Sequence, residues 1–160
     1  MTLSVQLVDY TDEKQASHLV ALLNSYAKDF MGGGKPLSDF TQENLAAELA
    51  KLPNAFSIMA YGDDKPAALV NCFVGFSTFA CKPLVNIHDL VVDTEFRGQG
   101  IAKKMLNAVK EQAEEIGACK LTLEVLFNNL LARRTYEKFG FVQYQLEESV
   151  GSAIYMELKL

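Results

Sequence analysis

The sequence has few of the residue types that most directly indicate a class of function. Its 160 residues include no tryptophan, only two histidines and only three cysteines. Cys72, Cys81 and Cys119 are odd in number and none belongs to a C-x-x-C motif, so we expect neither a disulfide framework nor a metal site. The simplest expectation is three reduced, mostly buried thiols in a cytoplasmic protein.

Long hydrophobic runs and an excess of basic residues are also missing. No apolar run reaches the roughly 18 residues of a membrane span, and the first residues lack the basic and then apolar pattern of a signal peptide. The formal net charge of −5 argues against a nucleic-acid partner, since phosphate binding requires a basic surface. An apolar content of 49% and a charged content of 22% are typical of a globular protein. We therefore expect one domain over residues 1–160, in the cytoplasm, with no membrane or nucleic-acid partner.

What the sequence does contain is a clear order of apolar patterns. Apolar residues that alternate with polar ones predict strands, and apolar residues spaced three and four apart predict helices. Strands are predicted at 3–10, 55–62, 67–80, 84–92, 119–125, 141–148 and 152–160, and helices at 11–30, 41–52, 101–116 and 128–139. Thr11 and Thr41 are the predicted starts of the first two helices, while Gly117 and Gly140 are expected to end the last two. Short links between the strands from 55 to 92 favour an antiparallel meander within an α/β protein.

The stretch "TEFRGQGIAKKML", residues 94–106, places a glycine-rich turn between a predicted strand and a predicted helix. The first amides of a helix have no partner within the helix, and the helix dipole makes this end an anion-binding site. Gly98 and Gly100 would let phosphate oxygens approach the backbone with no Cβ in the way, and Arg97 adds a fixed cation. The amides expected to bind are those of Gln99, Gly100, Ile101 and Ala102. The pattern predicts a diphosphate-binding turn.

Other interpretations of this turn remain open from the turn alone. A P-loop needs G-x-x-x-x-G-K-[ST], which "GGGKP" only imitates. A dinucleotide fingerprint needs a glycine where Lys103 stands, and it normally lies near the beginning of a βαβ unit. A glycine turn that only changes the direction of the chain is a third alternative.

Two motifs together resemble the GNAT superfamily of acyl-CoA-dependent N-acyltransferases. The pyrophosphate motif of that family, [QR]-x-x-G-x-[GA], is matched by Arg97, Gly100 and Ala102. Its second signature, N-x-x-A-x-x-x-Y-x-x-x-G-F, is matched by Asn129, Ala132, Tyr136, Gly140 and Phe141. The resemblance implies a single-domain α/β (α+β) fold. Its central sheet would be mixed and mostly antiparallel, with about seven strands and about four flanking helices, splayed between the strands near 85–92 and 119–126.

The resemblance also implies a binding site for acetyl-CoA as the donor substrate, with no metal. The pantetheine arm would lie between the splayed strands, against the backbone of Leu90, Val91 and Val92. Further cofactor-binding residues implied by the resemblance are Arg97, Gly98, Gln99, Gly100, Ile101, Ala102, Lys103, Asn129 and Tyr136. Lys103 and Lys104 lie near enough to the helix start to neutralise phosphates, although solvated lysines are an equal alternative for both. Asn129 is also an ordinary helix N-cap residue.

Acetyl transfer to an amine requires a group that removes a proton from the ammonium and a group that donates one to the thiolate. Tyr136 matches the family's tyrosine near the thioester sulfur, and we assign it as general acid. Asp89, His88 and Glu124 are the candidate bases, with Asp89 favoured because many relatives carry an acid at its position. Asp89 and His88 would point to opposite faces of a regular strand, but a β-bulge would change that parity.

The predicted function is therefore acetyl-CoA-dependent N-acetylation of a primary amine, on a small molecule, by direct attack in a ternary complex. The loop "FMGGGKPLSDF", residues 30–40, lies where relatives recognise the acceptor, and its glycines would suit a lid or a plain surface loop. A protein or peptide N-acetyltransferase and a non-catalytic acyl-CoA-binding module are the alternatives. A homodimer is left open, because relatives often dimerise through their last strands.

Overall fold

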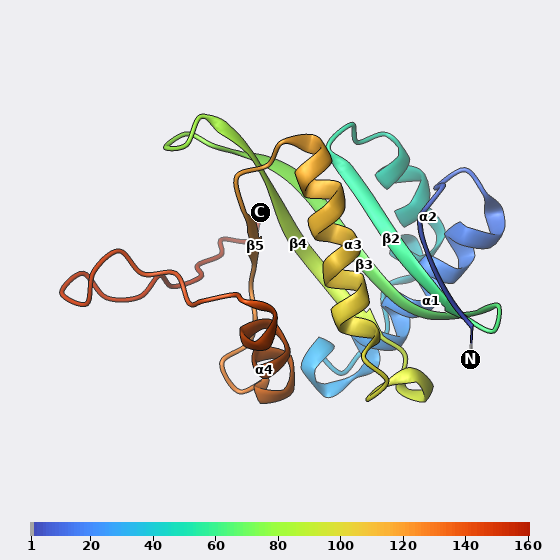
Figure 1. Ribbon diagram of the computed structural model, residues 1–160. Helices are drawn as coiled ribbons and strands as arrows, with labels where there is room; N and C mark the ends of the chain where they lie inside the picture. The colour runs from blue at the N-terminus through green and yellow to red at the C-terminus, as the bar shows by residue number, and fades with distance from the viewer. Residues whose placement is uncertain (1) are drawn as a thin grey trace.

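The computed structural model describes residues 2–160 and contains a single five-stranded sheet with the strands in chain order (Figure 1). The strands are β1 (Leu3–Leu7), β2 (Ala55–Gly62), β3 (Lys65–Ser77), β4 (Lys82–Val92) and β5 (Leu121–Leu123). The first four pair antiparallel, as the predicted meander requires, and β5 pairs parallel to β4. The helices are α1 (Glu13–Lys28), α2 (Asp39–Ala50), α3 (Ile101–Ile116) and α4 (Leu130–Phe139), with short 3₁₀ turns η1 (Phe30–Gly32) and η2 (Thr94–Phe96). The predicted mixed α/β fold is confirmed.

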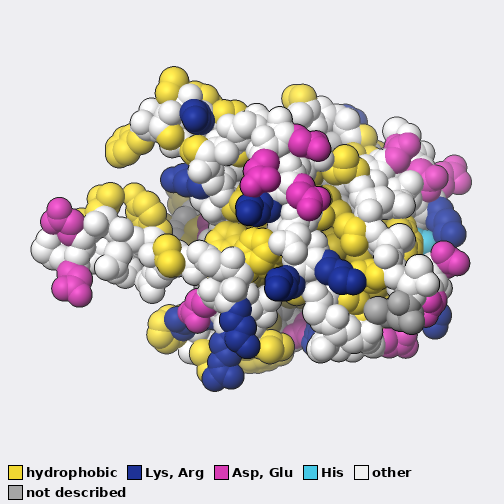
Figure 2. Space-filling model, in the orientation of Figure 1, with side chains coloured by type: hydrophobic (Ala, Val, Ile, Leu, Met, Phe, Trp, Pro, Cys, Tyr) yellow, Lys and Arg dark blue, Asp and Glu magenta, His cyan; other side chains and the backbone are white. Residues whose placement is uncertain are grey.

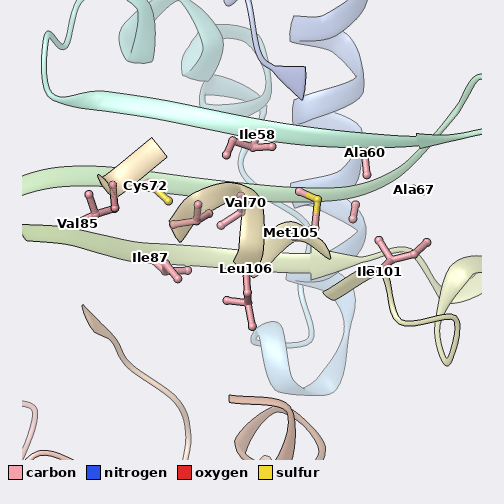
Figure 3. Packing of buried hydrophobic residues seen from close by; sticks show 13 residues of the cluster. Ile58, Ala60, Ala67, Val70, Cys72, Val85, Ile87, Ile101, Met105 and Leu106 are labelled. Atoms are coloured by element: carbon pink, nitrogen blue, oxygen red, sulfur yellow. The ribbon is translucent and has the colours of Figure 1, made fainter. Parts of the chain in front are cut away.

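Helices cover both faces of the sheet and bury a separate apolar cluster on each (Figure 1). The amphipathic helix α3 packs on one face, where its buried side chains meet strand residues including Ile58, Val70 and Ile87 (Figure 3). Helices α1 and α2 pack on the other face, where Leu19, Leu22, Leu49, Met59, Leu69 and Val91 are buried together. Because strand side chains alternate between faces, these two clusters show which way each strand residue points.

The helix ends differ from the predicted ones by a few residues. Asp12, not Thr11, caps α1, because its carboxylate accepts a hydrogen bond from the amide of Gln15 at 2.8 Å. Ser38, not Thr41, caps α2 through a 3.1 Å bond to the Thr41 amide. The two glycine ends are confirmed, since Gly117 and Gly140 have φ angles of 77° and 117° in the left-handed region that favours glycine.

The sheet of the described residues has five strands, not the predicted seven or so. Strand β5 is limited to three residues, and residues 142–160 form no strand beyond an isolated bridge between Gln145 and Ser152. This C-terminal segment leaves the body of the molecule after α4 (Figure 1). Its alternating apolar residues favour a strand, but a strand also needs a neighbouring edge for its hydrogen bonds, and the segment has none over most of its length.

The expectation of mostly buried cysteines is wrong for two of the three. Cys72 is buried, whereas Cys81 and Cys119 are exposed, and all three are free thiols. Burial raises the pKa of Cys72 to about 12, with a smaller contribution from the charge of Asp89. Within residues 2–160, no helix has the length and apolarity to cross a lipid bilayer, and no group of His, Cys, Asp or Glu side chains is placed to hold a metal ion.

Candidate active site

Strand β4 and the edge strand β5 pair over three residues only and then separate. The pairs join Val85, Asn86 and Ile87 to Leu121, Thr122 and Leu123, so the rest of β4 has no partner on its β5 side among the described residues. A pocket of about 370 Å³ opens between the separating strands. It gathers six residues predicted for the site, namely His88, Asp89, Leu90, Glu124, Asn129 and Tyr136. The predicted splay is confirmed, and one pocket contains every candidate acid and base.

A β-bulge in β4 determines how two of these candidates point. Asp89 lies opposite Asn71 on β3, yet the next residue on β3, Cys72, lies opposite Ile87, so His88 is an extra residue without a partner. Ile87 is buried against α3, whereas Val91, four residues later, is buried against α1. In a regular strand both would face the same way. The bulge therefore turns Asp89 to the α1 face, and His88 and Asp89 both line the pocket.

Asp89 is the most firmly held of the three candidate bases. Its Oδ2 accepts a hydrogen bond of 2.9 Å from Nδ2 of Asn71, and the carboxylate is half-buried. The exposed ring of His88 instead packs edge-on against Phe73, with the ring centroids 5.4 Å apart. Glu124 is exposed in the segment that follows β5. A fixed carboxylate at the pocket suits an interaction with a cationic amine.

Tyr136 of α4 supplies a phenol to the same pocket from its other side. Its ring packs edge-on against Phe141 at a centroid distance of 5.9 Å and belongs to the cluster on the α3 face. Burial, with a smaller contribution from Tyr26, raises the pKa of Tyr136 to about 12. The phenol is therefore fully protonated near neutral pH, which is the form a general acid requires.

Two tyrosines that the sequence reasoning missed also line the pocket. Tyr26 comes from the last turn of α1, and Tyr155 comes from the C-terminal segment. The pKa of Tyr26 is raised by burial first and then by the charges of Asp89 and Asp29. Neither residue belongs to a motif. In the sequence Tyr26 is only one more apolar position on an amphipathic helix, and no local signal distinguishes it.

Asn129 begins α4 and lies at the edge of the pocket. Its side-chain oxygen accepts a hydrogen bond of 3.3 Å from the Ala132 amide, so the predicted N-cap role is confirmed. The side-chain amide group is not used by that bond and can donate to a ligand.

The N-terminus of α3 differs from those of the other three helices of residues 2–160. Helices α1, α2 and α4 each have a side-chain cap, whereas α3 begins at Gly100, which provides none. Gly98 and Gly100 both have φ near 76°, and a Cβ added at either would meet no atom within 4 Å. The glycines are thus required by backbone conformation, and the space beside them is open. Uncapped amides facing open space fit a phosphate group.

Arg97 connects this turn to the predicted acceptor loop. Its Nη2 lies 3.2 Å from Oδ2 of Asp29, and its Nε donates to the carbonyl of Val92 at 3.1 Å. The pKa of Asp29 is lowered, chiefly by a hydrogen bond from the Met31 amide and then by Arg97. The guanidinium is therefore oriented beside the turn and partly neutralised by the carboxylate of Asp29, which directly precedes the acceptor loop.

The glycines of the acceptor loop have defined roles. A Cβ at Gly32 would lie 1.9 Å from the Tyr26 carbonyl oxygen, so only glycine fits at this close approach. Gly33 and Gly34 have φ angles of 115° and 73°, which favour glycine for conformational reasons. The loop is further held by a bond of 2.9 Å from the Leu37 amide to the Asn24 side chain. It follows directly after Tyr26, in the last turn of α1, and Asp29, the α1 C-cap, so it begins between the pocket and the glycine turn.

The remaining predicted cofactor residues are spread along β4 and α3. Leu90 lines the pocket, and Val91 is buried in the core on the α1 face. Lys103 and Lys104 are exposed on α3, where basic side chains cross its outer surface and continue onto α4 (Figure 2). Lys103 also borders a shallow hollow of about 510 Å³, shared with Lys110 and Lys138. Both lysines are free to meet an anionic ligand or solvent.

Comparisons with known proteins agree with this geometry. The model of the Acetyltransferase (GNAT) family matches residues 19–141. A [ribosomal protein bS18]-alanine N-acetyltransferase of Haemophilus ducreyi is 35% identical over 72 residues, which are 43% of this chain and 50% of the relative. A spermine/spermidine N(1)-acetyltransferase of Bacillus subtilis is 39% identical over 51 residues, which are 31% of this chain and 34% of the relative. The aligned part thus spans half or less of these curated relatives.

Solved structures show the same fold over nearly the whole chain. An aminoglycoside acetyltransferase from an uncultured soil metagenomic sample, crystallised with trehalose, superposes with a TM-score of 0.77. The match covers 98% of this chain and 97% of that protein, at 22% sequence identity. At this level of identity the likeness concerns the fold, and the acceptor has to be argued from the pocket.

Proposed function

The chain belongs to the GNAT acetyltransferase family, and from this premise we propose that it transfers the acetyl group of acetyl-CoA to a primary amine of a small molecule. The observation that carries the proposal is the single pocket in the β4–β5 splay. It combines a held carboxylate, Asp89, with a protonated phenol, Tyr136, next to a strand edge without a partner. Asp89 would remove a proton from the ammonium, Tyr136 would donate one to the thiolate, and the strand edge would offer backbone amides to the carbonyl oxygen.

Acetyl-CoA would bind along the splay and at the α3 N-terminus. The uncapped amides from Gln99 to Lys103 would donate to the two linked phosphates, with Arg97 beside them and Lys103 and Lys104 nearby. The edge of β4 after Ile87, formed by residues 88–92, would offer backbone groups to the pantetheine amides, as in the addition of a strand to a sheet edge. Asn129 would contribute its free side-chain amide group. Bound in this way, acetyl-CoA would have its thioester end in the pocket.

Asp89 would act on the amine. An alkyl ammonium has a pKa of about 10.4, so only about one molecule in 2,500 is neutral at pH 7. The carboxylate attracts the ammonium and accepts its proton, directly or through water, and the freed lone pair attacks the thioester carbonyl carbon. A new C–N bond forms and the C–S bond breaks. The second proton of the attacking nitrogen passes to solvent, because Asp89 already holds the first, and Asp89 then releases its own proton to solvent. Backbone amides on the open edge of β4 are candidate donors to the developing oxyanion.

Tyr136 would donate its proton to the departing thiolate. A phenol with a pKa of about 12 is a weaker acid than a thiol in water, whose pKa is ~8.5, by about 5 kcal/mol. The thiolate would form beside this buried phenol, and burial raises the pKa of a thiol too, so the difference at the moment of transfer is smaller. Solvent then returns the proton to the phenolate. A direct proton transfer therefore needs Tyr136 aligned with the sulfur.

The pocket favours a small cationic acceptor. Two carboxylates, Asp89 and Glu124, line it together with three phenols and several apolar residues, the phenols being those of Tyr26, Tyr136 and Tyr155. A volume of about 370 Å³ suits an alkylamine chain or one ring of an aminoglycoside beside the thioester. Polyamines and aminoglycosides, which the names of similar proteins mention, are the first classes to test.

A second candidate acceptor is a peptide N-terminus. Two of the similar proteins are named as a [ribosomal protein bS18]-alanine N-acetyltransferase and an N-alpha-acetyltransferase. The acidic pocket suits any ammonium, so the identity of the amine has to be measured.

The test is a measurement of CoA thiol release over a panel containing spermidine, an aminoglycoside and an alanine-initiated peptide. Mass spectrometry would confirm a product heavier by one acetyl group. We expect turnover with at least one small amine, and greater efficiency with it than with the peptide. Binding of CoA without turnover on any amine would support the non-catalytic module, and preference for the peptide would support the second candidate.

A further inference from the structure

A line of polar side chains crosses the sheet beneath the pocket and ends at Asp89. Tyr10, from the link between β1 and α1, lies 2.8 Å from the Ser57 hydroxyl of β2. Ser57 donates to Oδ1 of Asn71 on β3 at 2.6 Å, and Nδ2 of Asn71 donates to Oδ2 of Asp89 on β4 at 2.9 Å. Ser57 and Asn71 are 1% and 4% exposed, the two polar residues found among the buried side chains of the described chain. Burying a polar group costs free energy unless the group is hydrogen-bonded, so the presence of these two residues in the core requires an explanation.

The register of the strands creates this line. Ser57 lies directly opposite Asn71, and Asn71 lies directly opposite Asp89. Side chains opposite each other on one face of a sheet are close enough for hydrogen bonds. Asp89 joins the line only because the bulge at His88 turns it to the α1 face. The same irregularity that brings Asp89 to the pocket therefore also brings it to Asn71.

The hydrogen bonds in this line all have the same direction. The single hydroxyl proton of Ser57 goes to Asn71, so the Tyr10 hydroxyl must be the donor to Ser57. Asn71 accepts with its oxygen and donates with its nitrogen, which fixes the orientation of its amide from both sides. Each donor thus points toward the carboxylate of Asp89. A reversed amide would set an oxygen against that carboxylate, so the line permits only this arrangement.

We infer that Asn71 and Ser57 are positioning residues for Asp89, an inference that rests on the proposed role of Asp89 toward the amine. Asn71 holds Oδ2 and thereby fixes the plane of the carboxylate. Oδ1, for which the described residues provide no hydrogen-bond donor, is left to the ammonium of the acceptor. Ser57 acts one step further away by keeping the amide of Asn71 in the donating orientation. No substrate atom needs to touch either residue.

The test is a double-mutant cycle with Asn71→Ala, Asp89→Ala and the combined variant. It measures kcat and KM for the amine and for acetyl-CoA. We expect Asn71→Ala to lower kcat/KM for the amine roughly tenfold to a hundredfold, as for a misplaced catalytic group, with KM for acetyl-CoA unchanged. In the Asp89→Ala background the same change should cost less than about twofold, because there is no carboxylate left to orient.

Cys72→Ala is the matched control for a merely structural effect. Cys72 follows Asn71 in β3 and is 1% exposed, but it faces α3 and takes no part in the line. The control should lower the melting temperature and leave the kinetics near those of the wild type. If Asn71→Ala is too unstable, Ser57→Ala replaces it, with an expected loss of roughly threefold to tenfold that also vanishes without Asp89.

Three outcomes would overturn the inference. Equal kinetics of Asn71→Ala and Cys72→Ala would show that Asn71 is only structural. Losses that multiply in the double variant would show that Asn71 does not act through Asp89. Absence of turnover by the wild-type protein on every amine would refute the proposed function itself, and this result is distinguishable because it appears before any variant is compared.

Discussion

The glycine at the start of α3 allows a test that separates ligand binding from folding. Gly100→Ala adds one methyl group to a residue with φ of 76°. The added Cβ meets nothing within 4 Å, so the cost is that of the left-handed conformation alone, about 1–2 kcal/mol. For a chain of this length, that should lower the melting temperature by roughly 2–8 °C. The protein should still fold.

The effect on CoA binding should be larger, because the new methyl group projects beside the amides proposed to hold the phosphates. Each hydrogen bond to a charged group contributes about 1.5–3 kcal/mol, and 1.4 kcal/mol corresponds to a factor of ten. Losing one such bond should therefore raise the dissociation constant of CoA by roughly tenfold to a hundredfold. Isothermal titration calorimetry would measure it directly.

The opposite end of the same helix provides the control. Gly117 has φ of 77° and likewise nothing within 4 Å of an added Cβ. Gly117→Ala should therefore cost the same stability and leave CoA binding unchanged. If the two variants bind CoA equally well, the phosphates do not lie at the α3 N-terminus and the reasoning is refuted.

Four further predictions concern Tyr136, Asp29 and Gly32. Tyr136→Phe should lower kcat by about a hundredfold or more while CoA affinity is retained, and unchanged kcat would exclude Tyr136 as general acid. Burial raises the pKa of Tyr136 from its ordinary value of 10.0 to about 12, so its contribution to stability is fully present below pH 10 and should be lost as pH rises from about 10 to 12. Denaturation curves of Tyr136→Phe should lack that part of the loss. Asp29→Asn should strengthen CoA binding severalfold in low-salt titrations, because the carboxylate no longer competes with the phosphates for Arg97, and weaker binding would contradict this. In Gly32→Ala the added Cβ would lie 1.9 Å from the Tyr26 carbonyl oxygen, so the free energy of unfolding in urea should fall by more than about 2 kcal/mol. The KM for the amine should rise as well. An unaffected KM would show that this loop does not contribute to the acceptor site.

The parts of the fold that were predictable are those with local causes. Gly98, Gly100, Gly117 and Gly140 all have positive φ, a conformation that glycine adopts without strain, so the sequence itself marks where α3 begins and where α3 and α4 end. The antiparallel order of strands β2 to β4 was equally clear, because only short links join these strands. Asn129 and Tyr136 were found because a family motif fixes their spacing on one helix.

The parts that were not predictable depend on partners far away in the chain. A bulge is a property of two paired strands, so neither the sequence of β4 nor that of β3 reveals by itself that His88 is the extra residue. Ser57 and Asn71 are 14 residues apart, and Asn71 and Asp89 are 18 apart, so their line appears only once the register is known. Each of these residues alone looks like an ordinary polar position in a strand.

The C-terminal segment shows the opposite case, a strong local pattern that the fold does not use. Val142, Tyr144 and Leu146 alternate as in a strand, and each is at least 60% exposed. The hydrophobic side chains gather visibly along the segment that projects from the body (Figure 2). Alternation predicts which face a strand would present, but it does not supply the edge with which the strand must pair.

The central claim is that the amides at the start of α3 bind the phosphates of CoA and direct its thiol end into the β4–β5 splay. The most direct measurement is a titration of ¹⁵N-labelled protein with CoA, followed by amide chemical shifts. The account predicts that the largest changes occur at residues 98–103, with a second group at residues 88–92 on the open edge of β4. Changes confined to another surface, such as the hollow beside Lys110 and Lys138, or no changes at saturating CoA, would contradict it.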